Sequence, residues 1–416
     1  MKYSTDKSFC EELDQKDSLK SYKDLFFIPK NKQGKELIYF CGNSLGLQPK
    51  KTKEYILQEI DDWKTHAVEG HFHAKNPWLP YHEMLSASYS KLIGAKSSEV
   101  IAMNTLTVNL HLMMVSFYKP EKNKFKILIE KDAFPSDIYA VESQIKFHGF
   151  KSDEALIKLE PRKGEYFIRQ EDIEKIIKEN SNEIALILIG GVNYYTGQLF
   201  DMQKITKVGH ENGVVVGFDL AHAIGNVKLE LNKWNVDFAV WCSYKYLNSG
   251  PGAIAGAFVN ERFHNAELPR FTGWWGHNKK ERFLMDDKFK PIKSAEGWQL
   301  SNPPIFSLAP VFASLSIFDK VGMDDLIKKS KALTNYLEFL IKSIDNKNIE
   351  IIDVPMRGCQ LSIRVKNYDK KLFNNLTENG IVSDWREPDV IRIAPVPLYN
   401  TFTDAFNFYQ TLKKLL

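Results

Sequence analysis

Lys245 is the residue whose sequence surroundings point most directly to covalent chemistry. It lies in WCSYKYLNSGPG, between Tyr244 and Tyr246, after an apolar run and before a Gly/Pro turn. A lysine that is partly removed from water gives up its proton more easily, so its amine can form a Schiff base with an aldehyde. The alternative is a surface lysine whose aliphatic stem lies across neighbouring aromatic rings.

Asp219 is a possible partner for a cationic ring. It ends the apolar run GVVVGFD and begins the motif DLAH. A carboxylate at the carboxyl end of a buried parallel strand lies where such sheets bind ligands, and it needs a cation or several N–H donors there. A protonated pyridine nitrogen would meet that need, and so would the start of a following helix that Asp219 caps. The 26 positions from Asp219 to Lys245 allow one strand–helix–strand excursion, which would return the chain to the same ligand.

A third feature predicts phosphate binding. The segment NTLT at 104–107 opens an expected helix, whose free N–H groups form an anion site, and Thr107 could add a hydroxyl; a plain N-cap is the alternative. In FPSD, Phe134 begins another helix and could stack on a planar ring or belong to the core. The chain has no Gly-x-Gly-x-x-Gly motif and no P-loop. Together these features predict a pyridoxal 5'-phosphate (PLP) enzyme with Lys245 as its Schiff-base lysine.

The elements that must position these residues alternate between apolar strands and helices. Strands are expected at 125–130, 184–189, 213–219, 236–241 and 253–259, and helices at 105–118, 135–148, 170–180 and 201–212. Continuous apolar strands separated by helices predict a parallel sheet covered on both faces, in an α/β fold. We expect this large domain to span 49–305 and to contain the cofactor site.

The rest of the chain predicts a smaller α+β domain at 306–416, joined by an N-terminal arm at 1–48. We expect helices from Pro49 to about His66 and at 81–94, a loop at 71–80, and an irregular stretch at 260–308. The C-terminal part should contain a helical stretch at 309–345, strands near 349–353, 359–365 and 390–394, and helices at 370–378 and 402–415.

Composition excludes several other classes of protein. A net charge of +4 over 416 residues makes no basic stripe, so nucleic-acid binding is not expected. The four cysteines form no CxxC or CxxH pair, so no metal site is expected and reduced thiols fit best. The first residues carry many acids and no apolar stretch, and no apolar run approaches membrane length, so we expect a soluble, cytoplasmic protein.

Several motifs make the chain resemble the kynureninase family, fold-type I PLP enzymes among the class V aminotransferase relatives. They are YFCGNSLGLQPK, NTLTVNLHLMMVSFYKP, KDAFPSDIYAVESQIKFHG, GGVNYYTGQLFD, GFDLAHAIGNV, VDFAVWCSYKYLNSGPGAIAGAF, GWWGH, SNPPIF and RIAPVPLYN. The similarity runs in order from about Tyr39 to the C-terminus. Asp-x-x-His followed by Ser-Tyr-Lys is shared with the wider superfamily, whereas FPSD, GWWGH, SNPP and RIAPVPLYN are more specific.

The resemblance implies a mainly parallel seven-stranded sheet and a homodimer with shared active sites. It implies hydrolysis of L-kynurenine or 3-hydroxy-L-kynurenine to L-alanine and an anthranilate, in tryptophan catabolism or NAD biosynthesis. Lys245 would hold PLP, Asp219 would face its pyridine nitrogen, and Tyr244 would either donate a proton near the γ-carbonyl or only contact the phosphate. The other cofactor contacts would come from Leu106, Thr107, Phe134, Ser136, Asp137, Gly190 and His222, with Trp274 and Asn302 reaching in from the partner subunit.

The resemblance also assigns the substrate contacts. Arg392 would bind the α-carboxylate, because its planar fork can bond both oxygens. His71, Ser301 and Asn302 would line the aryl pocket and resemble the branch that prefers 3-hydroxykynurenine, since a ring hydroxyl needs a polar partner. Gly190 departs from the family, where a small hydroxyl residue is frequent, and this would cost one cofactor contact.

Two alternatives remain at this stage. One is another fold-type I PLP lyase or transaminase, such as a cysteine desulfurase, which needs a nucleophilic cysteine on a mobile loop. Cys359 begins an apolar strand-like run and is expected to be structural. The other is a PLP-binding protein without catalysis, against which the presence of Arg392 and His71 argues.

Overall fold

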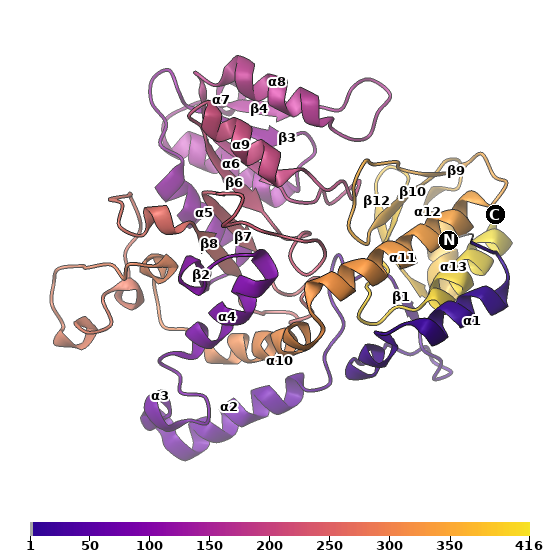
Figure 1. The fold of residues 1–416 in the computed structure, drawn as a ribbon, viewed down its shortest axis with the longest axis horizontal. Helices are drawn as coiled ribbons and strands as arrows, with labels where there is room; N and C mark the ends of the chain where they lie inside the picture. The colour runs from indigo at the N-terminus through magenta and orange to yellow at the C-terminus, as the bar shows by residue number, and fades with distance from the viewer. Residues whose placement is uncertain (1–2) are drawn as a thin grey trace.

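A seven-stranded sheet forms the centre of the larger part of the molecule (Figure 1). The computed structural model describes residues 3–416. In spatial order the strands are β2 (Val100–Ala102), β8 (Gly256–Val259), β7 (Phe238–Trp241), β6 (Val215–Asp219), β5 (Ile184–Gly190), β3 (Lys126–Glu130) and β4 (Leu156–Leu159). All neighbours from β7 to β4 are parallel, and β8 runs antiparallel to both β7 and β2. The expected mainly parallel sheet of seven strands is confirmed.

Helices cover both faces of this sheet, because alternate side chains of the apolar strands are buried on opposite sides. Ile127, Ile129 and Leu188 pack in one core with α5 (Leu106–Phe117) and α6 (Pro135–Phe147). Leu128 and Ile187 pack in the other core, whose helices are α4 (Tyr81–Ile93), α8 (Gln170–Asn180), α9 (Met202–Glu211) and α10 (Ile305–Val321). The helices carrying NTLT and FPSD therefore lie on the same face.

The smaller part has its own sheet and core (Figure 1). Its antiparallel strands run in the order β12 (Asp384–Arg386), β13 (Val390–Ile393), β10 (Leu361–Val365) and β9 (Ile349–Ile351). The helices α11 (Met323–Lys342), α12 (Asp369–Glu378) and α13 (Phe402–Leu415) pack against it.

The N-terminal segment packs with this smaller part. Asp14 of α1 (Lys7–Lys16) accepts hydrogen bonds from the backbone N–H groups of Phe402 and Thr403, at 2.7 and 2.9 Å, at the start of α13. β1 (Ile38–Tyr39) pairs in parallel with β11 (Ile381–Val382). The two ends of the chain are therefore neighbours in space (Figure 1).

The helical stretch expected at 309–345 is two helices rather than one. α10 and α11 meet at an angle of 82°, and Gly322 between them has a φ of 74°. Within the described chain no single helix is long and apolar enough to cross a membrane; only this bent pair, taken together, has the length and composition. Because Leu308 and Val311 of α10 belong to the core of the larger part, we propose that the domain boundary lies near Gly322 instead of at 305/306.

The remaining elements are short or begin later than expected. α2 (Thr52–His66) starts after Pro49, which instead forms a β-bridge with Phe26. Part of the loop expected at 71–80 is the single helical turn α3 (Gly70–His73), and α7 (Ser152–Ala155) is another such turn. The 3₁₀ turns are η1 (Lys20–Leu25), η2 (Ala67–Glu69), η3 (Ser97–Glu99), η4 (Glu261–Phe263), η5 (Trp274–Gly276), η6 (Arg282–Leu284) and η7 (Ala295–Trp298). Four of them interrupt the stretch 260–304, which is otherwise irregular as expected.

Candidate active site

A cavity of about 530 Å³ lies where β3, β5 and β6 end and α5 and α6 begin. Ten of its fourteen lining residues are ones that the sequence singled out: Leu106, Thr107, Phe134, Ser136, Asp137, Gly190, Asp219, His222, Tyr244 and Lys245. The other four are Glu130, Val192, Tyr194 and Ala221. The carboxyl ends of parallel strands are the usual ligand edge of such a sheet, so the fold explains why distant segments meet here.

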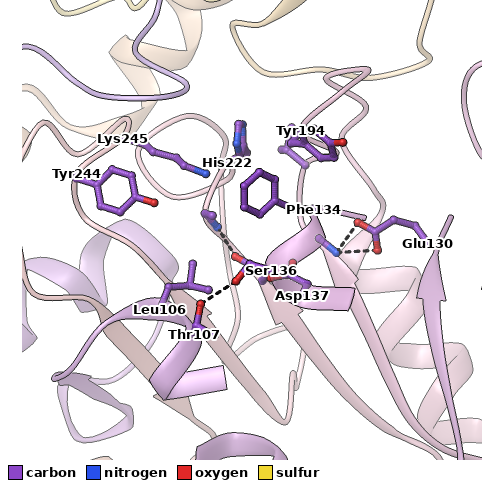
Figure 2. A pocket seen from close by; sticks show the side chains of 14 residues that line it. Leu106, Thr107, Glu130, Phe134, Ser136, Asp137, Tyr194, His222, Tyr244 and Lys245 are labelled. Atoms are coloured by element: carbon purple, nitrogen blue, oxygen red, sulfur yellow. Dashed lines mark hydrogen bonds between the residues drawn. The ribbon is translucent and has the colours of Figure 1, made fainter. Parts of the chain in front are cut away.

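Lys245 and Tyr244 point toward the cavity from one side and Phe134 faces them (Figure 2). Tyr244 and Lys245 follow β7, in a loop whose next residues are buried. The Lys245 Nζ lies 5.6 Å from the centre of the Phe134 ring. Burial raises the pKa of the Tyr244 phenol, and the nearby Cys242 thiol adds to that rise, so the hydroxyl keeps its proton at neutral pH.

Asp219 ends β6 and shares the cavity wall with Asp137, in the first turn of α6. One Asp219 oxygen accepts a hydrogen bond from the Ala221 N–H at 2.7 Å, and the residue lines the cavity; β6 is followed by turns and not by the expected helix, so Asp219 caps no helix there. Burial raises the pKa of Asp219, while the Ala221 N–H and Lys245 oppose the rise. Burial and the Asp219 carboxyl push the pKa of Asp137 well upward. Because Asp219 has the N–H donor, it is the better carrier of the negative charge of this pair.

His222 also lines the cavity and is buried. Its Nδ1 has no hydrogen-bond partner within residues 3–416. Burial lowers its pKa far below the usual range, and the nearby cations Lys245 and Arg392 lower it further. The imidazole is therefore neutral and has an unused polar atom at the cavity.

The opposite end of the cavity is built from two helix N-termini. Leu106 and Thr107 begin α5, and Ser136 is in the first turn of α6. The hydroxyl groups of Thr107 and Ser136 lie 2.9 Å apart and share a hydrogen bond (Figure 2). Free N–H groups at two converging helix starts, with two hydroxyls, form a site suited to an anion such as a phosphate.

Glu130 and Tyr194 belong to this wall although the sequence interpretation missed them. Both oxygens of Glu130 lie 3.1 Å from the Gly190 nitrogen, and burial raises the pKa of this carboxyl to about 7, with Asp219 adding to the rise. The Tyr194 ring meets Phe134 edge-on at 5.3 Å. The strand end KILIE could have pointed to Glu130, because a charged residue that closes a buried strand needs partners.

Five other predicted site residues do not line this cavity in the single chain: His71, Trp274, Ser301, Asn302 and Arg392. Trp274 is 42% exposed and donates from its indole nitrogen to the Arg282 carbonyl oxygen at 3.1 Å. Ser301 and Asn302 are exposed, and His71 packs edge-on against Trp78 at 5.5 Å.

Arg392 of β13 is buried next to the cavity wall rather than on it. Its guanidinium donates to the Tyr194 carbonyl oxygen at 2.6 Å and pairs with the Asp384 carboxylate. Its Nε has no partner in the described part of the chain. The fork therefore retains one free donor.

Comparison with family profiles gives two matches. The Kynureninase C-terminal domain matches residues 326–412, and the DegT/DnrJ/EryC1/StrS aminotransferase family matches residues 152–231.

Solved structures with the same fold include cysteine desulfurases. The enzyme of Thermococcus onnurineus superposes with a TM-score of 0.75 at 16% identity, covering 91% of this chain and 94% of its own. The cysteine desulfurase CsdA of Escherichia coli superposes with a TM-score of 0.77 at 14% identity, covering 95% of this chain and 97% of its own. Identities this low show the fold alone, which is that of these enzymes.

Curated relatives match over nearly the whole length. The kynureninase of Flavobacterium psychrophilum is 54% identical, covering 98% of this chain and 97% of the relative. The kynureninase of Myxococcus xanthus is 52% identical, covering 99% of this chain and 97% of the relative. The kynureninase of the animal Nematostella vectensis is 47% identical, covering 98% and 93%. With a shared fold, a cavity built from the predicted residues and this full-length identity, the chain belongs to the kynureninase family of enzymes.

Proposed function

We propose that the cavity binds PLP through Lys245 and that the enzyme hydrolyses L-kynurenine or 3-hydroxy-L-kynurenine to an anthranilate and L-alanine. One observation carries the proposal. The Lys245 amine, the buried Asp219 carboxylate and two helix N-termini surround a single cavity, beside the ring of Phe134. An aldehyde, a pyridine nitrogen and a phosphate on one small molecule would satisfy all three.

The polar atoms of the cavity fit this cofactor. His222 Nδ1 and Asp137 Oδ1 are buried and have no hydrogen-bond partner in residues 3–416, so each has an unmet bond that a ligand could satisfy. Phe134 offers a flat apolar face to a ring, and the starts of α5 and α6 offer donors to a phosphate.

When bound, PLP supplies an electron-withdrawing ring for the substrate's α-carbon and β-carbon. Asp219 keeps the ring nitrogen protonated by charge pairing. Lys245, once its amine is free, is placed to move the proton at the α-carbon. Tyr244, whose pKa is raised by burial, holds a proton that it can donate to the γ-carbonyl oxygen.

Arg392 is the group that we propose for the substrate's α-carboxylate. Its guanidinium already pairs with Asp384, and Arg386 contacts that same carboxylate, with nitrogen–oxygen distances of 2.9 and 3.0 Å. This pairing fixes the arginine fork before substrate arrives, and the free Nε leaves a donor for an incoming carboxylate.

We also propose a homodimer with shared active sites. Large apolar side chains are exposed on the irregular segment, where Phe283 is 55%, Leu284 74% and Met285 71% exposed. Trp63 and Phe72 are 60% and 56% exposed near α2 and α3. These exposed apolar groups support the proposed contact with a second copy. A second copy could bring Trp274 and Asn302 to the cofactor, and His71, Ser301 and Asn302 to the substrate ring.

The polar nature of His71, Ser301 and Asn302 favours 3-hydroxykynurenine as the preferred substrate. A polar group that hydrogen-bonds the ring hydroxyl of 3-hydroxykynurenine has no partner when kynurenine, which lacks that hydroxyl, is bound. The expected result is a higher kcat/KM for 3-hydroxykynurenine. A higher value for kynurenine would reject this preference without affecting the reaction type.

A desulfurase or another fold-type I lyase is the alternative activity. Cys10, Cys242 and Cys359 are buried, and burial raises the pKa of Cys359 to about 12. Such thiols are poor nucleophiles. Cys41 is half-buried, and burial raises its pKa as well. We therefore expect no sulfide release from cysteine. Four free thiols also favour a reducing compartment, and we propose the cytoplasm.

The deciding experiment combines turnover with chemical trapping. Purified enzyme is assayed for fluorescent anthranilate from both kynurenines, with and without added PLP, and is then reduced with borohydride and mapped by mass spectrometry. We expect turnover that depends on PLP and a pyridoxyl adduct on Lys245. Lys245→Ala should fold and lose activity by orders of magnitude. An adduct on another lysine would reject the proposed site.

A further inference from the structure

Glu130 is a buried acid of the cavity wall that the proposed mechanism does not use. It ends β3, is 4% exposed and lines the same cavity as Lys245 and Asp219. The Gly190 N–H donates to its two oxygens, each 3.1 Å from the nitrogen (Figure 2). Within residues 3–416 no lysine, arginine or histidine forms an ion pair with it. A buried acid in the wall of a ligand cavity, with backbone N–H groups and no cation as partners in the described chain, needs a reason.

Glu130 connects two segments that both line the cavity. Its backbone leads directly into the turn that carries Phe134, where the Ala133 N–H donates to the Glu130 carbonyl oxygen at 3.3 Å. Its side chain reaches across to Gly190, at the end of β5. Gly190 is in register with Asp219 on β6. One side chain therefore joins the segment of Phe134 to the strand beside Asp219.

The contact at Gly190 is close enough that the two residues depend on each other. A Cβ at position 190 would lie 2.8 Å from Glu130 Oε1, a separation that real Cβ atoms do not show. Gly190 is not among the residues with positive φ, so a side chain there would meet the Glu130 carboxyl and not a backbone restriction, and the end of the glutamate side chain would have to shift. The following residue continues the connection, because the Gly191 N–H donates to the Asp219 carbonyl oxygen at 2.7 Å.

The charge of the wall is consistent with this structural use of an acid. Burial, with Asp219 nearby, raises the pKa of Glu130 to about 7, so a large share of the carboxyl is neutral at pH 7. A neutral carboxyl can remain buried with an N–H as its partner. It also leaves Asp219 as the main negative charge of the wall.

The structure assigns Glu130 as a positioning residue: its carboxyl fixes the end of β5, beside Asp219, relative to the segment that carries Phe134, and so sets how these two groups are placed around the cavity. The inference rests on the proposed function, since PLP is the expected occupant of this cavity. It adds a residue that acts on the cofactor only through Gly190.

The test measures PLP binding to the apoenzyme, followed by the absorbance and the induced circular dichroism of the bound cofactor. Glu130→Ala leaves the Gly190 N–H unpaired, so the Kd for PLP should rise by roughly 10- to 100-fold, and the dichroism should fall because the ring is held less rigidly. Glu130→Gln keeps an acceptor oxygen at the same reach and should restore both values. Glu130→Asp, which shortens the side chain but keeps the carboxyl, is measured if the alanine variant does not fold.

A reciprocal variant and a matched control separate positioning from general stability. Gly190→Ala should weaken PLP binding by displacing the Glu130 carboxyl, and the double variant Glu130→Ala/Gly190→Ala should bind PLP no worse than Glu130→Ala alone, because the methyl group then has no carboxyl to displace. Glu99 is the control: it is fully buried and accepts from the Glu261 N–H at 2.9 Å, outside the cavity. Glu99→Ala should lower the melting temperature and leave the dichroism unchanged.

The outcomes distinguish this inference from the proposed function. If wild-type enzyme takes up PLP on Lys245 while Glu130→Ala binds it with the same Kd and the same dichroism, the positioning role is rejected and the proposed function remains. The role is also rejected if the two single effects simply multiply in the double variant. If the wild-type enzyme takes up no PLP, the proposed function fails and this inference fails with it.

Discussion

Tyr244 and Lys245 are neighbours in the sequence with different tasks in the cavity. The Lys245 amine faces the Phe134 ring, whereas Tyr244 is 36% exposed and presents a hydroxyl whose pKa burial raises. The hydroxyl is protonated at neutral pH and can donate, although its raised pKa also makes it a weaker acid than an exposed phenol. A contact to phosphate would need only the hydroxyl's hydrogen bond.

Tyr244→Phe distinguishes these two uses. We expect kcat to fall by roughly 10²- to 10⁴-fold, the usual contribution of a proton donor, with little change in the Kd for PLP. Steady-state kinetics at saturating PLP and an absorbance titration measure the two quantities. A weaker Kd with normal kcat at saturating PLP would instead identify a phosphate contact.

The raised pKa of Glu130 predicts that the stability of the protein falls as the pH rises through the range 4.5 to 7. Its pKa is raised from 4.5 to about 7 in the folded protein, so the folded state binds its proton more tightly than the unfolded chain does. Its contribution to stability is full below about pH 4.5 and is lost as the pH rises to 7. The free energy of unfolding of Glu130→Gln, relative to that of wild type, should therefore rise by up to about 3 kcal/mol between pH 5 and pH 8.

Urea unfolding of both apoenzymes at the two pH values tests this expectation. Asp219, Asp137 and His222 share the wall and titrate in both proteins, so the difference between the two proteins isolates Glu130. An unchanged difference between pH 5 and pH 8 would contradict the prediction.

At the scale of elements, the starts of helices make contacts that form the site and join distant segments. The starts of α5 and α6 form the anion end of the cavity, and the start of α13 is capped from another segment of the chain. Asp14 of α1 receives the Phe402 and Thr403 N–H groups, which ties the N-terminal segment to the last helix. Elements far apart in the sequence are thus joined by single polar side chains.

Asp14→Ala should destabilise the protein by about 1–2 kcal/mol, because two helix-start N–H groups lose their acceptor. Glu12 on the same helix is exposed and, within residues 3–416, pairs with Lys16 alone, so Glu12→Ala should stay within about 0.5 kcal/mol of wild type. Urea unfolding monitored by circular dichroism compares the two variants. Equal effects would show that the Asp14 contacts add nothing.

At the scale of the whole molecule, we propose that a second copy of the chain completes the site. Lys245 lines the cavity, while Trp274 is exposed on a segment that extends away from the sheet (Figure 1). A closed two-fold dimer would place this segment of one copy against the cavity of the other, in both directions at once. The proposed shared site then needs residues from two chains.

Mixing two inactive variants tests shared sites. Lys245→Ala and Trp274→Ala are each expected to have low activity alone. After unfolding and refolding together, half of the dimers should be mixed and each should contain one intact site, which gives about a quarter of wild-type activity by random pairing. No recovery would place both residues in the same subunit's site, and size-exclusion chromatography checks that dimers form.

Much of the fold could be predicted from local pattern. The apolar strands from 125 to 259 and their helices appear nearly where the sequence indicates, because long apolar runs and helix starts are local signals. β2, β4, β11 and β12 escaped notice because each has only two to four residues. The break at Gly322 was also missed, because an apolar pattern continues across it.

The sequence by itself determined the chemistry: a lysine, a carboxylate, an aromatic ring and two helix starts, each in a motif that the kynureninase family shares. Only the tertiary structure decided which of them meet. It brought ten predicted residues to one cavity, left Trp274 and His71 away from it, and showed Glu130 against Gly190. The reason is physical, since residue type sets what a group can do, whereas distances between strand ends and the room for a Cβ at Gly190 arise only when the sheet is assembled.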